Sequence, residues 1–209
     1  MLAGQRQSAA VFFYDSLYRE VRNAYEGGTA CLEDILSSEG ILETERLKLR
    51  ELTEKDYEAL CLILQDEETM YAYEGAFDDV EAREWLERQM ERYRKWGFGL
   101  WAVILKENGE LIGQCGLTMQ PWKDGEVLEI GYLFRRAYWR QGYATEAAAA
   151  CKKYAFDVLR ADEVCSIIRD TNTASRKVAL RNGMVPADTA VKHYKGVDMP
   201  HIRYVALRG

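Results

Sequence analysis

The seven-residue stretch Trp139-Arg140-Gln141-Gly142-Tyr143-Ala144-Thr145 has the composition of an anion-binding turn. It lies between a strongly apolar segment and an alanine-rich one, which places it between a strand and the start of a helix. Small residues at 142 and 144 let a ligand approach the backbone, and the first amides of a helix have no internal partner. Three or four such amides, at about 1.5 to 3 kcal/mol each, would dominate the binding of a pyrophosphate.

The same Gly-x-Ala pair is equally expected of an ordinary tight helix start. The turn is not a Walker loop, because no Gly-Lys-Ser or Gly-Lys-Thr follows it. A Rossmann fingerprint would need a third glycine and a parallel crossover. The neighbouring segments therefore have to decide between a phosphate site and a plain helix start.

A second chemical group is Glu129, a carboxylate inside an otherwise apolar run. Burial would raise its pKa and suit it to act as a general base. A strand-edge carboxylate in water or in a salt bridge is the equally weighted alternative. We interpret Cys115 and Cys151 as buried sulfur rather than nucleophiles, and His193 and His201 as structural histidines.

Periodicity predicts the elements that position these groups. Leucines alternating with charges predict a strand at 45–52, and Thr53 with Asp56 predicts the cap of a helix that runs to Gln65. The other expected elements are helices over 80–95, 140–159 and 173–181, and strands over 100–105, 111–119, 127–134, 164–168, 185–194 and 201–207. Together they predict a mixed α/β (α+β) domain in which helices cover a largely antiparallel sheet.

Residues 1–40 differ from the rest of the chain. Apolar positions such as Val11, Tyr14 and Leu17 recur at helical spacing before the breaker Glu26-Gly27-Gly28-Thr29. We expect an N-terminal helical extension here, followed by a single domain over 41–209. The extension is expected to pack on that domain or on a second subunit, with a separate recognition role as the alternative.

Composition narrows the class of protein. The chain of 209 residues has 28 Lys and Arg against 34 Asp and Glu, a net charge of −6, so nucleic acid and anionic membranes are not expected partners. Its five cysteines include no Cys-x-x-Cys pair, which favours reduced thiols over a metal site. No apolar run approaches the roughly 20 residues of a membrane span. We therefore expect a cytoplasmic protein.

Four segments share their pattern with one family. They are Thr44-Glu45-Arg46-Leu47-Lys48-Leu49-Arg50, Glu129-Ile130-Gly131-Tyr132, the stretch from Tyr138 to Ala147, and Asn172-Thr173-Ala174-Ser175 followed by Leu180-Arg181-Asn182-Gly183-Met184. As a set they resemble the GNAT superfamily of N-acetyltransferases, in particular its ribosomal-protein alanine N-acetyltransferase-like (Rim-like) branch. The resemblance implies the GNAT-type acyl-CoA N-acyltransferase fold, acetyl-CoA as co-substrate and no metal.

The resemblance also assigns site residues. It implies that the backbone of Leu133, Phe134 and Arg135 pairs with the pantetheine amide, and that Arg140, Gln141, Gly142, Tyr143, Ala144 and Thr145 hold the pyrophosphate. Asn172 would hydrogen-bond the pantetheine arm, besides capping a helix. Ser175 would lie beside the thiol and is the candidate acid, since no tyrosine occurs between 172 and 184. Glu129 would lie beside the acceptor channel.

The acceptor is a primary amine in this reading, either a protein N-terminal α-amine or a small-molecule amine. Tyr73 and Glu74, in the loop over 70–77, are the candidate acceptor-binding residues, and Glu74 would suit a cationic amine. The alternative function is a non-catalytic acyl-CoA-binding sensor or interaction module. A homodimer is a further expectation, because the superfamily often dimerises.

Overall fold

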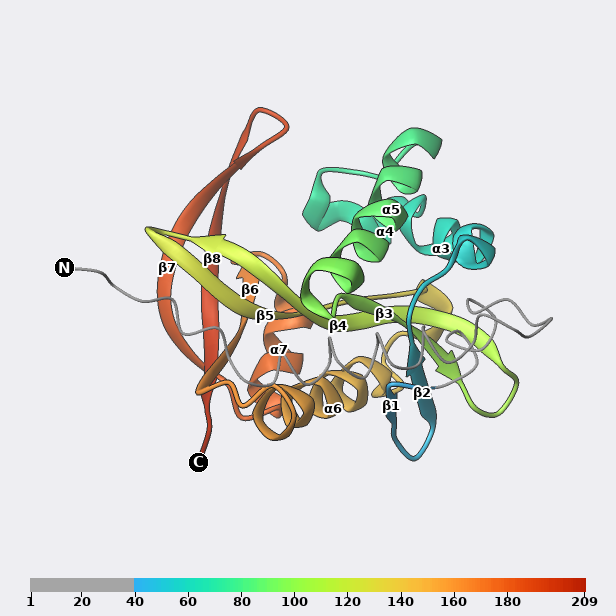
Figure 1. Ribbon diagram of the computed structural model, residues 1–209. Coiled ribbons are helices and arrows are strands. Elements are labelled where there is room, and N and C mark those ends of the chain that lie inside the picture. Colours follow the sequence, from blue (N-terminus) through green and yellow to red (C-terminus); the bar gives the residue numbers. More distant parts are fainter. Residues whose placement is uncertain (1–39) are drawn as a thin grey trace.

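The computed structural model describes residues 40–209, which are built on one eight-stranded sheet (Figure 1). The strand order is β1-β2-β3-β4-β5-β6-β8-β7, antiparallel at every pair except β5 with β6. The strands are β1 Leu42–Glu43, β2 Leu47–Arg50, β3 Leu100–Leu105, β4 Glu110–Trp122, β5 Gly125–Phe134, β6 Glu163–Arg169, β7 Val185–Tyr194 and β8 Val197–Leu207. The predicted mixed, mostly antiparallel sheet is confirmed. The helical extension expected over 1–40 lies outside the described residues, except for Gly40.

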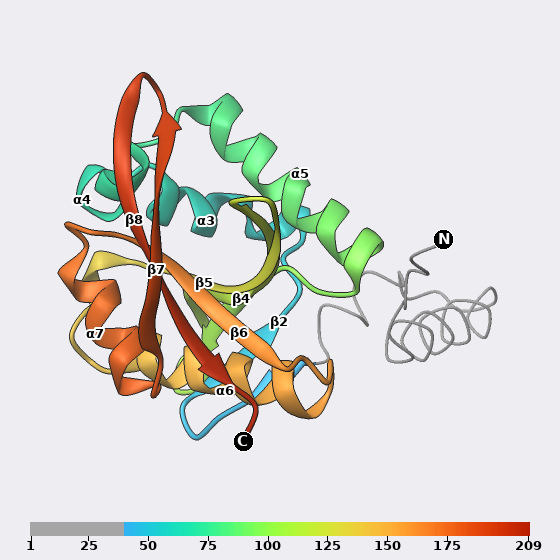
Figure 2. The same ribbon diagram turned by 90° about the vertical axis from the view of Figure 1, so that its left-hand side faces the viewer.

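Helices cover the sheet on both faces, as the two perpendicular views show (Figures 1 and 2). One face carries α3 Tyr57–Leu64, α4 Glu67–Met70 and α5 Asp79–Trp96, and the other carries α6 Tyr143–Asp157 and α7 Thr173–Arg181. Three short 3₁₀ turns connect them: η1 Glu54–Asp56, η2 Tyr71–Tyr73 and η3 Arg136–Tyr138. The described residues thus form a three-layer α/β arrangement.

Local signals in the sequence account for most of these elements. Thr53 and Asp56 form the predicted cap, in which the Thr53 N–H donates to Asp56 Oδ2 over 2.8 Å. The helix over 173–181 has the predicted bounds. Two elements, β1 and α4, were not predicted, because segments of two to four residues are too short to show a period.

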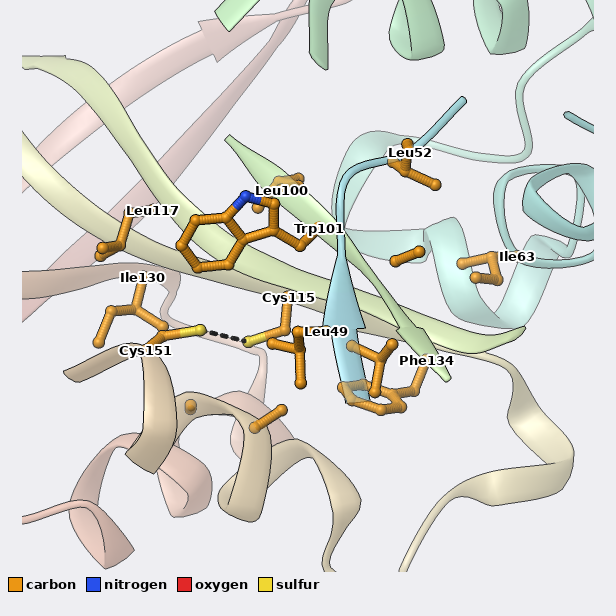
Figure 3. Close-up of a cluster of buried hydrophobic side chains, with 14 of the residues drawn as sticks. Leu49, Leu52, Ile63, Leu100, Trp101, Cys115, Leu117, Ile130, Phe134 and Cys151 are labelled. Atoms are coloured by element: carbon orange, nitrogen blue, oxygen red, sulfur yellow. Dashed lines mark hydrogen bonds between the residues drawn. The ribbon is translucent and has the colours of Figure 1, made fainter. Parts of the chain in front are cut away.

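The core lies on both faces of the sheet, which packs against α6 on one side and against α3 and α5 on the other; Figure 3 shows part of it. Trp101 on β3 is fully buried and packs edge-on against Tyr154 of α6, with ring centroids 5.3 Å apart. The small side chains of Ala147 and Ala148 let this helix approach the sheet closely. Cys115 and Cys151 meet there as thiols, with their sulfurs 3.6 Å apart.

The sheet opens between β5 and β6. In the described part of the chain these two parallel strands pair at one position, Glu129 with Cys165, and β6 otherwise follows β8. Because β5 and β6 are parallel, their carboxyl ends lie on the same edge, and each leads to a helix there, α6 and α7. This splay is where an open α/β sheet offers space for a ligand.

The β7–β8 hairpin forms a wall beside the splay. It turns at Lys195 and Gly196, whose φ angles of 47° and 80° suit a tight hairpin turn. Both ribbon views show the hairpin extending to the side of the sheet that carries α5 (Figures 1 and 2). Its tip is fastened there, because Lys195 Nζ lies 2.8 Å from the Glu81 carboxylate. The hairpin and α5 therefore enclose the space above the splay.

Candidate active site

A cavity of about 390 Å³ lies at the splay and is lined by residues from both helical layers, the sheet and the β7–β8 hairpin. Its volume falls within the range of small-molecule sites, roughly 300 to 1,000 Å³. Of the predicted site residues, Tyr73, Glu129, Leu133, Asn172 and Ser175 line it. Residues expected to bind the cofactor and residues expected to meet the acceptor thus share one continuous space.

Glu129 lies at the point where β5 and β6 part. Its Oε1 accepts a hydrogen bond from the backbone N–H of Ile167 over 3.1 Å. Burial raises the pKa of the Glu129 carboxyl, and this effect outweighs the opposing influence of the Lys192 and Arg92 charges and of the Ile167 hydrogen bond. A carboxylate with a raised pKa, held inside a cavity, has the properties of a general base.

The pairing of β5 corrects one detail of the expected cofactor site. The carbonyl of Ile130 accepts from the Ser166 hydroxyl of β6 over 2.9 Å, so the even-numbered residues of β5 direct their backbone groups toward β6. Antiparallel pairing turns the odd-numbered residues toward β4 instead. The N–H groups that face the splay therefore belong to Tyr132 and Phe134, whereas the N–H of Leu133, a residue that also lines the cavity, faces β4.

The structure also revises the expectation for Arg135. Its N–H donates to Ile112 O over 2.9 Å, and its guanidinium pairs with Glu110. The neighbouring Arg136 pairs with Asp66 and Glu68 at 3.2 and 2.6 Å. These two arginines are thus engaged by carboxylates, which the strand pattern gave no means of foreseeing.

The turn from β5 to α6 has the geometry that an anion site requires. Arg140 and Gly142 have φ angles of 62° and 88°. Gly142 is the N-cap of α6 and supplies no side-chain cap, and the first intrahelical bond runs from the Glu146 N–H to its carbonyl over 3.0 Å. Within residues 40–209, the amides of Tyr143, Ala144 and Thr145 consequently have no backbone partner and remain available to phosphate oxygens.

Arg46 supports this turn from the opposite end of the domain sequence. Its Nε donates to Glu146 Oε2 over 2.7 Å, and its Nη1 donates to Gln141 O over 3.0 Å. The guanidinium also lies 4.4 Å from the ring centre of Tyr143. Arg46 thereby neutralises an acid in the first turn of α6 and brings positive charge to the turn. The first-strand motif contained this arginine, yet the strand pattern alone assigned it no role.

Glu146 completes that contact. Burial opposes its ionisation, but hydrogen bonds from Thr44 and Arg46 together hold its pKa below the ordinary value. The Thr44 hydroxyl donates over 2.6 Å and the Arg46 N–H over 3.0 Å. These hydrogen bonds therefore hold the β1–β2 turn against the first turn of α6.

The start of α7 lies on the other side of the splay. Asn172 Oδ1 accepts the Ser175 N–H over 3.0 Å, so the predicted helix-cap role is confirmed. The Tyr132 hydroxyl donates to the Ser175 carbonyl over 3.0 Å, which ties β5 to α7. Tyr132 lines the cavity as well and was not among the predicted side chains.

The two predicted acceptor residues occupy different environments. Tyr73 lines the cavity and packs edge-on against Trp85, with ring centroids 5.7 Å apart. Glu74 is not among the lining residues, because its carboxylate pairs with Arg169 at the end of β6. Glu74 therefore connects the region of η2 to the end of β6, and its charge is already matched.

Sequence reasoning missed two arginines of this cavity, Arg92 and Arg169. Arg92 of α5 lines it, and its position seven residues after Trp85 places both on one helix face, a signal that could have found it. Lys192, His193 and His201 line it from the β7–β8 hairpin. In residues 40–209 no three His, Cys, Asp or Glu side chains gather to hold a metal ion, and no helix there is long and apolar enough to cross a bilayer.

Comparison with known proteins identifies the family. Residues 46–185 match the model of the acetyltransferase (GNAT) domain. The chain is 36% identical over 157 residues to the uncharacterized protein YkkB of Bacillus subtilis (strain 168), which covers 75% of this chain and 91% of that protein. It is 33% identical over 139 residues to the uncharacterized N-acetyltransferase p20 of Bacillus licheniformis, and the alignment covers 66% of this chain and 78% of that protein. The chain therefore belongs to the GNAT acetyltransferase family.

A solved structure shows the same fold. RimL, a ribosomal L7/L12 α-N-protein acetyltransferase in complex with coenzyme A, aligns with a TM-score of 0.67 over 81% of this chain and 98% of its own, at 18% identity. As a GNAT protein the chain is an acetyl-CoA-dependent N-acetyltransferase. The expected family, fold and co-substrate are confirmed.

Proposed function

We propose that this enzyme transfers the acetyl group of acetyl-CoA directly to a primary amine, either a protein N-terminal α-amine or a small-molecule amine, in the cavity around Glu129. The observation that carries the proposal is the position of Glu129. It lies in one continuous cavity with Asn172 and Ser175 toward the cofactor turn and with Tyr73 toward the opposite wall. A base between donor and acceptor is what direct transfer requires.

Residues on the cofactor side have separate tasks. The amides of Tyr143 to Thr145 hold the pyrophosphate, and Arg46 adds positive charge close to them. The backbone N–H groups of Tyr132 and Phe134 pair with the pantetheine arm, and one of them polarises the thioester carbonyl. The bound co-substrate supplies an acetyl group activated as a thioester.

On the acceptor side, Glu129 takes the proton from the amine, directly or through one water, as nitrogen bonds to the acetyl carbon. The carbon–sulfur bond breaks, and Ser175 is the candidate group for returning a proton to the departing thiolate. Deprotonating an α-amine at pH 7 costs only about 1 kcal/mol, against about 4 to 5 kcal/mol for a lysine side chain. An α-amine therefore depends least on the strength of this base.

The test is a titration with acetyl-CoA by calorimetry, followed by thiol release in the presence of peptides and small amines. Micromolar binding with release for one class of acceptor is the expected result. Tight binding without release across the panel would favour a sensor, and absence of binding would reject the proposal.

Cellular location and assembly are part of the same proposal. A cytoplasmic location is supported by four buried thiols, Cys61, Cys115, Cys151 and Cys165, all of them free in the described chain. The expected homodimer is tested by analytical ultracentrifugation of the full chain, where a single species of monomer mass would contradict it.

A further inference from the structure

The acceptor side of the cavity carries more positive than negative charge. Arg92 enters from α5, Lys192 from β7 and Arg169 from the end of β6. Among the described lining residues, Glu129 is the one carboxylate. This balance is opposite to that of the whole chain, whose net charge is −6. The positive charge is therefore a local property of the cavity.

Two of these cations are not matched by a close carboxylate. Arg169 pairs with Glu74. Arg92 donates from Nη1 to the amide oxygen of Gln89 over 3.0 Å, and within residues 40–209 neither it nor Lys192 forms an ion pair. Both act on Glu129 only as more distant charges.

The cavity histidines do not change this balance. Burial lowers the pKa of His201, and the charges of Lys192 and Arg169 lower it further, so this ring is neutral at pH 7. Its Nδ1 lies 2.8 Å from Met199 O. His193 Nδ1 lies 2.9 Å from Asp198 and is exposed near the hairpin tip.

The two unmatched cations stand on separate walls. Arg92 belongs to the helix above the sheet and Lys192 to the hairpin beside it, and the two ribbon views show both elements on the same side of the sheet (Figures 1 and 2). The Lys195–Glu81 ion pair fastens one wall to the other. A ligand that enters between these walls meets Glu129 below and cations on both sides.

We propose that the acceptor is a primary amine that also carries an anionic group, a carboxylate or a phosphate, and that Arg92 and Lys192 bind this group while the amine lies at Glu129. This inference rests on the proposed function and adds the substrate class. A polyamine or an aminoglycoside would place further positive charge against the two cations. Glu74, which the sequence suggested for a cationic amine, is engaged by Arg169 instead.

The first experiment compares acceptors of similar size whose second group differs in charge, with each kcat/KM expressed per concentration of neutral amine. β-Alanine, β-alaninamide and 1,3-diaminopropane share a primary amine and a three-carbon skeleton, and end in a carboxylate, a neutral amide and an ammonium. The peptide amides Ser-Asp-Asp-NH2, Ser-Asn-Asn-NH2 and Ser-Arg-Arg-NH2 repeat the comparison for an N-terminal amine, without a C-terminal carboxylate and without a second primary amine. In at least one series, kcat/KM for the acidic member is expected to be about 10-fold higher than for the neutral member. The difference between the acidic and the cationic member is expected to be larger still. Equal or higher kcat/KM for the neutral or cationic members in both series would overturn the inference.

The second experiment reverses the charge of the cavity. Lys192→Glu is expected to lower kcat/KM for the acidic acceptor at least about 10-fold and to raise it for the cationic one. The control is Lys153→Glu, because Lys153 is exposed on α6 and changes the net charge equally. Unchanged acetyl-CoA affinity verifies that each variant is folded. A variant that loses activity toward all acceptors equally would contradict a charge-selective role.

A binding measurement separates this inference from the proposed function. N-acetyl-β-alanine and N-acetyl-β-alaninamide are titrated into the enzyme with coenzyme A. If the acid binds more tightly than the amide, and Lys192→Glu abolishes this difference, the anion site is supported. This holds even if no amine releases thiol, because absence of thiol release would reject only the proposed catalysis. Equal binding of acid and amide would overturn the anion site even if acetyl transfer is observed.

Discussion

The backbone N–H of Ile167 on β6 donates to the Glu129 carboxylate on β5 over 3.1 Å, across the point where the two strands separate. This bond fixes the carboxylate from the neighbouring strand, so its orientation does not depend on its own side-chain torsions alone. The opening of the sheet and the position of the Glu129 carboxylate, the proposed base, are thus one structural feature. Its consequence for catalysis can be measured directly.

Replacing the carboxylate tests its role. Glu129→Gln keeps the shape of the side chain and removes the base, so kcat/KM is expected to fall about 10²- to 10⁴-fold. Acetyl-CoA affinity should stay within about threefold, because the amides proposed to bind the pyrophosphate lie on α6. Glu126→Gln, an exposed carboxylate on the same strand, is the matched control. Equal losses in the two variants would contradict the assignment.

The pH dependence of the reaction follows from the raised pKa of Glu129. The base acts in its ionised form, and burial raises its pKa, so kcat/KM should rise with pH through a pKa above the ordinary glutamate value. The ratio of wild-type to Glu129→Gln rates isolates this group from the titration of the acceptor amine. A ratio that is constant with pH would exclude Glu129 as the base.

Gly142 should be required for cofactor binding. Its φ of 88° disfavours any Cβ, and an added Cβ would lie 3.4 Å from Arg46 Nη2. Gly142→Ala is expected to weaken acetyl-CoA binding by about 1 to 2 kcal/mol, roughly a 5- to 30-fold rise in Kd. Gly109→Ala has a similar φ of 74° with open space around it and should leave Kd unchanged. Calorimetry measures the Kd for acetyl-CoA in both variants. A rise in Gly142→Ala alone would assign the effect to the turn before α6, and equal values in the two variants would contradict it.

Arg46 is expected to act through the α6 turn. Arg46→Ala removes the contacts to Glu146 and Gln141 and should raise the Kd for acetyl-CoA about 10-fold or more. Arg46→Lys should restore little, since an ammonium cannot reproduce the two-sided contact. Arg83→Ala removes an exposed surface arginine and serves as control. Full affinity in Arg46→Ala would show that the turn needs no support from β2.

Glu51 should make stability depend on pH. Burial raises its pKa to about 7 in the folded state, against 4.5 for the ordinary group. Folding favours the neutral form of Glu51. Its contribution to the free energy of unfolding is therefore fully present below about pH 4.5 and is lost as the pH rises through about 7. Glu51→Gln should raise the free energy of unfolding at pH 8 by about 1 to 3 kcal/mol and change it little at pH 4.5. Urea unfolding at the two pH values, with exposed Glu58→Gln as control, measures the difference.

The sequence by itself determined the elements and the cofactor turn. Periodicity placed the long strands and helices, because amphipathic spacing is a local property of the chain. The turn from Trp139 to Thr145 was predicted from its small residues at a strand–helix junction, and its φ angles and uncapped amides agree with that prediction. Glu129 was singled out because a charged residue inside an apolar segment can be recognised from the sequence alone.

Only the tertiary structure decided what surrounds these groups. The contact of Arg46 with Glu146 joins residues 100 positions apart, and no local pattern specifies such a pair. Strand register turned the amides of Tyr132 and Phe134 toward the splay, in place of Leu133. Arg92 and Lys192 line the same cavity as Glu129 because a helix and a hairpin from distant parts of the chain lie over the same opening in the sheet. Side-chain partners across the sheet depend on packing and register, which the linear sequence does not display.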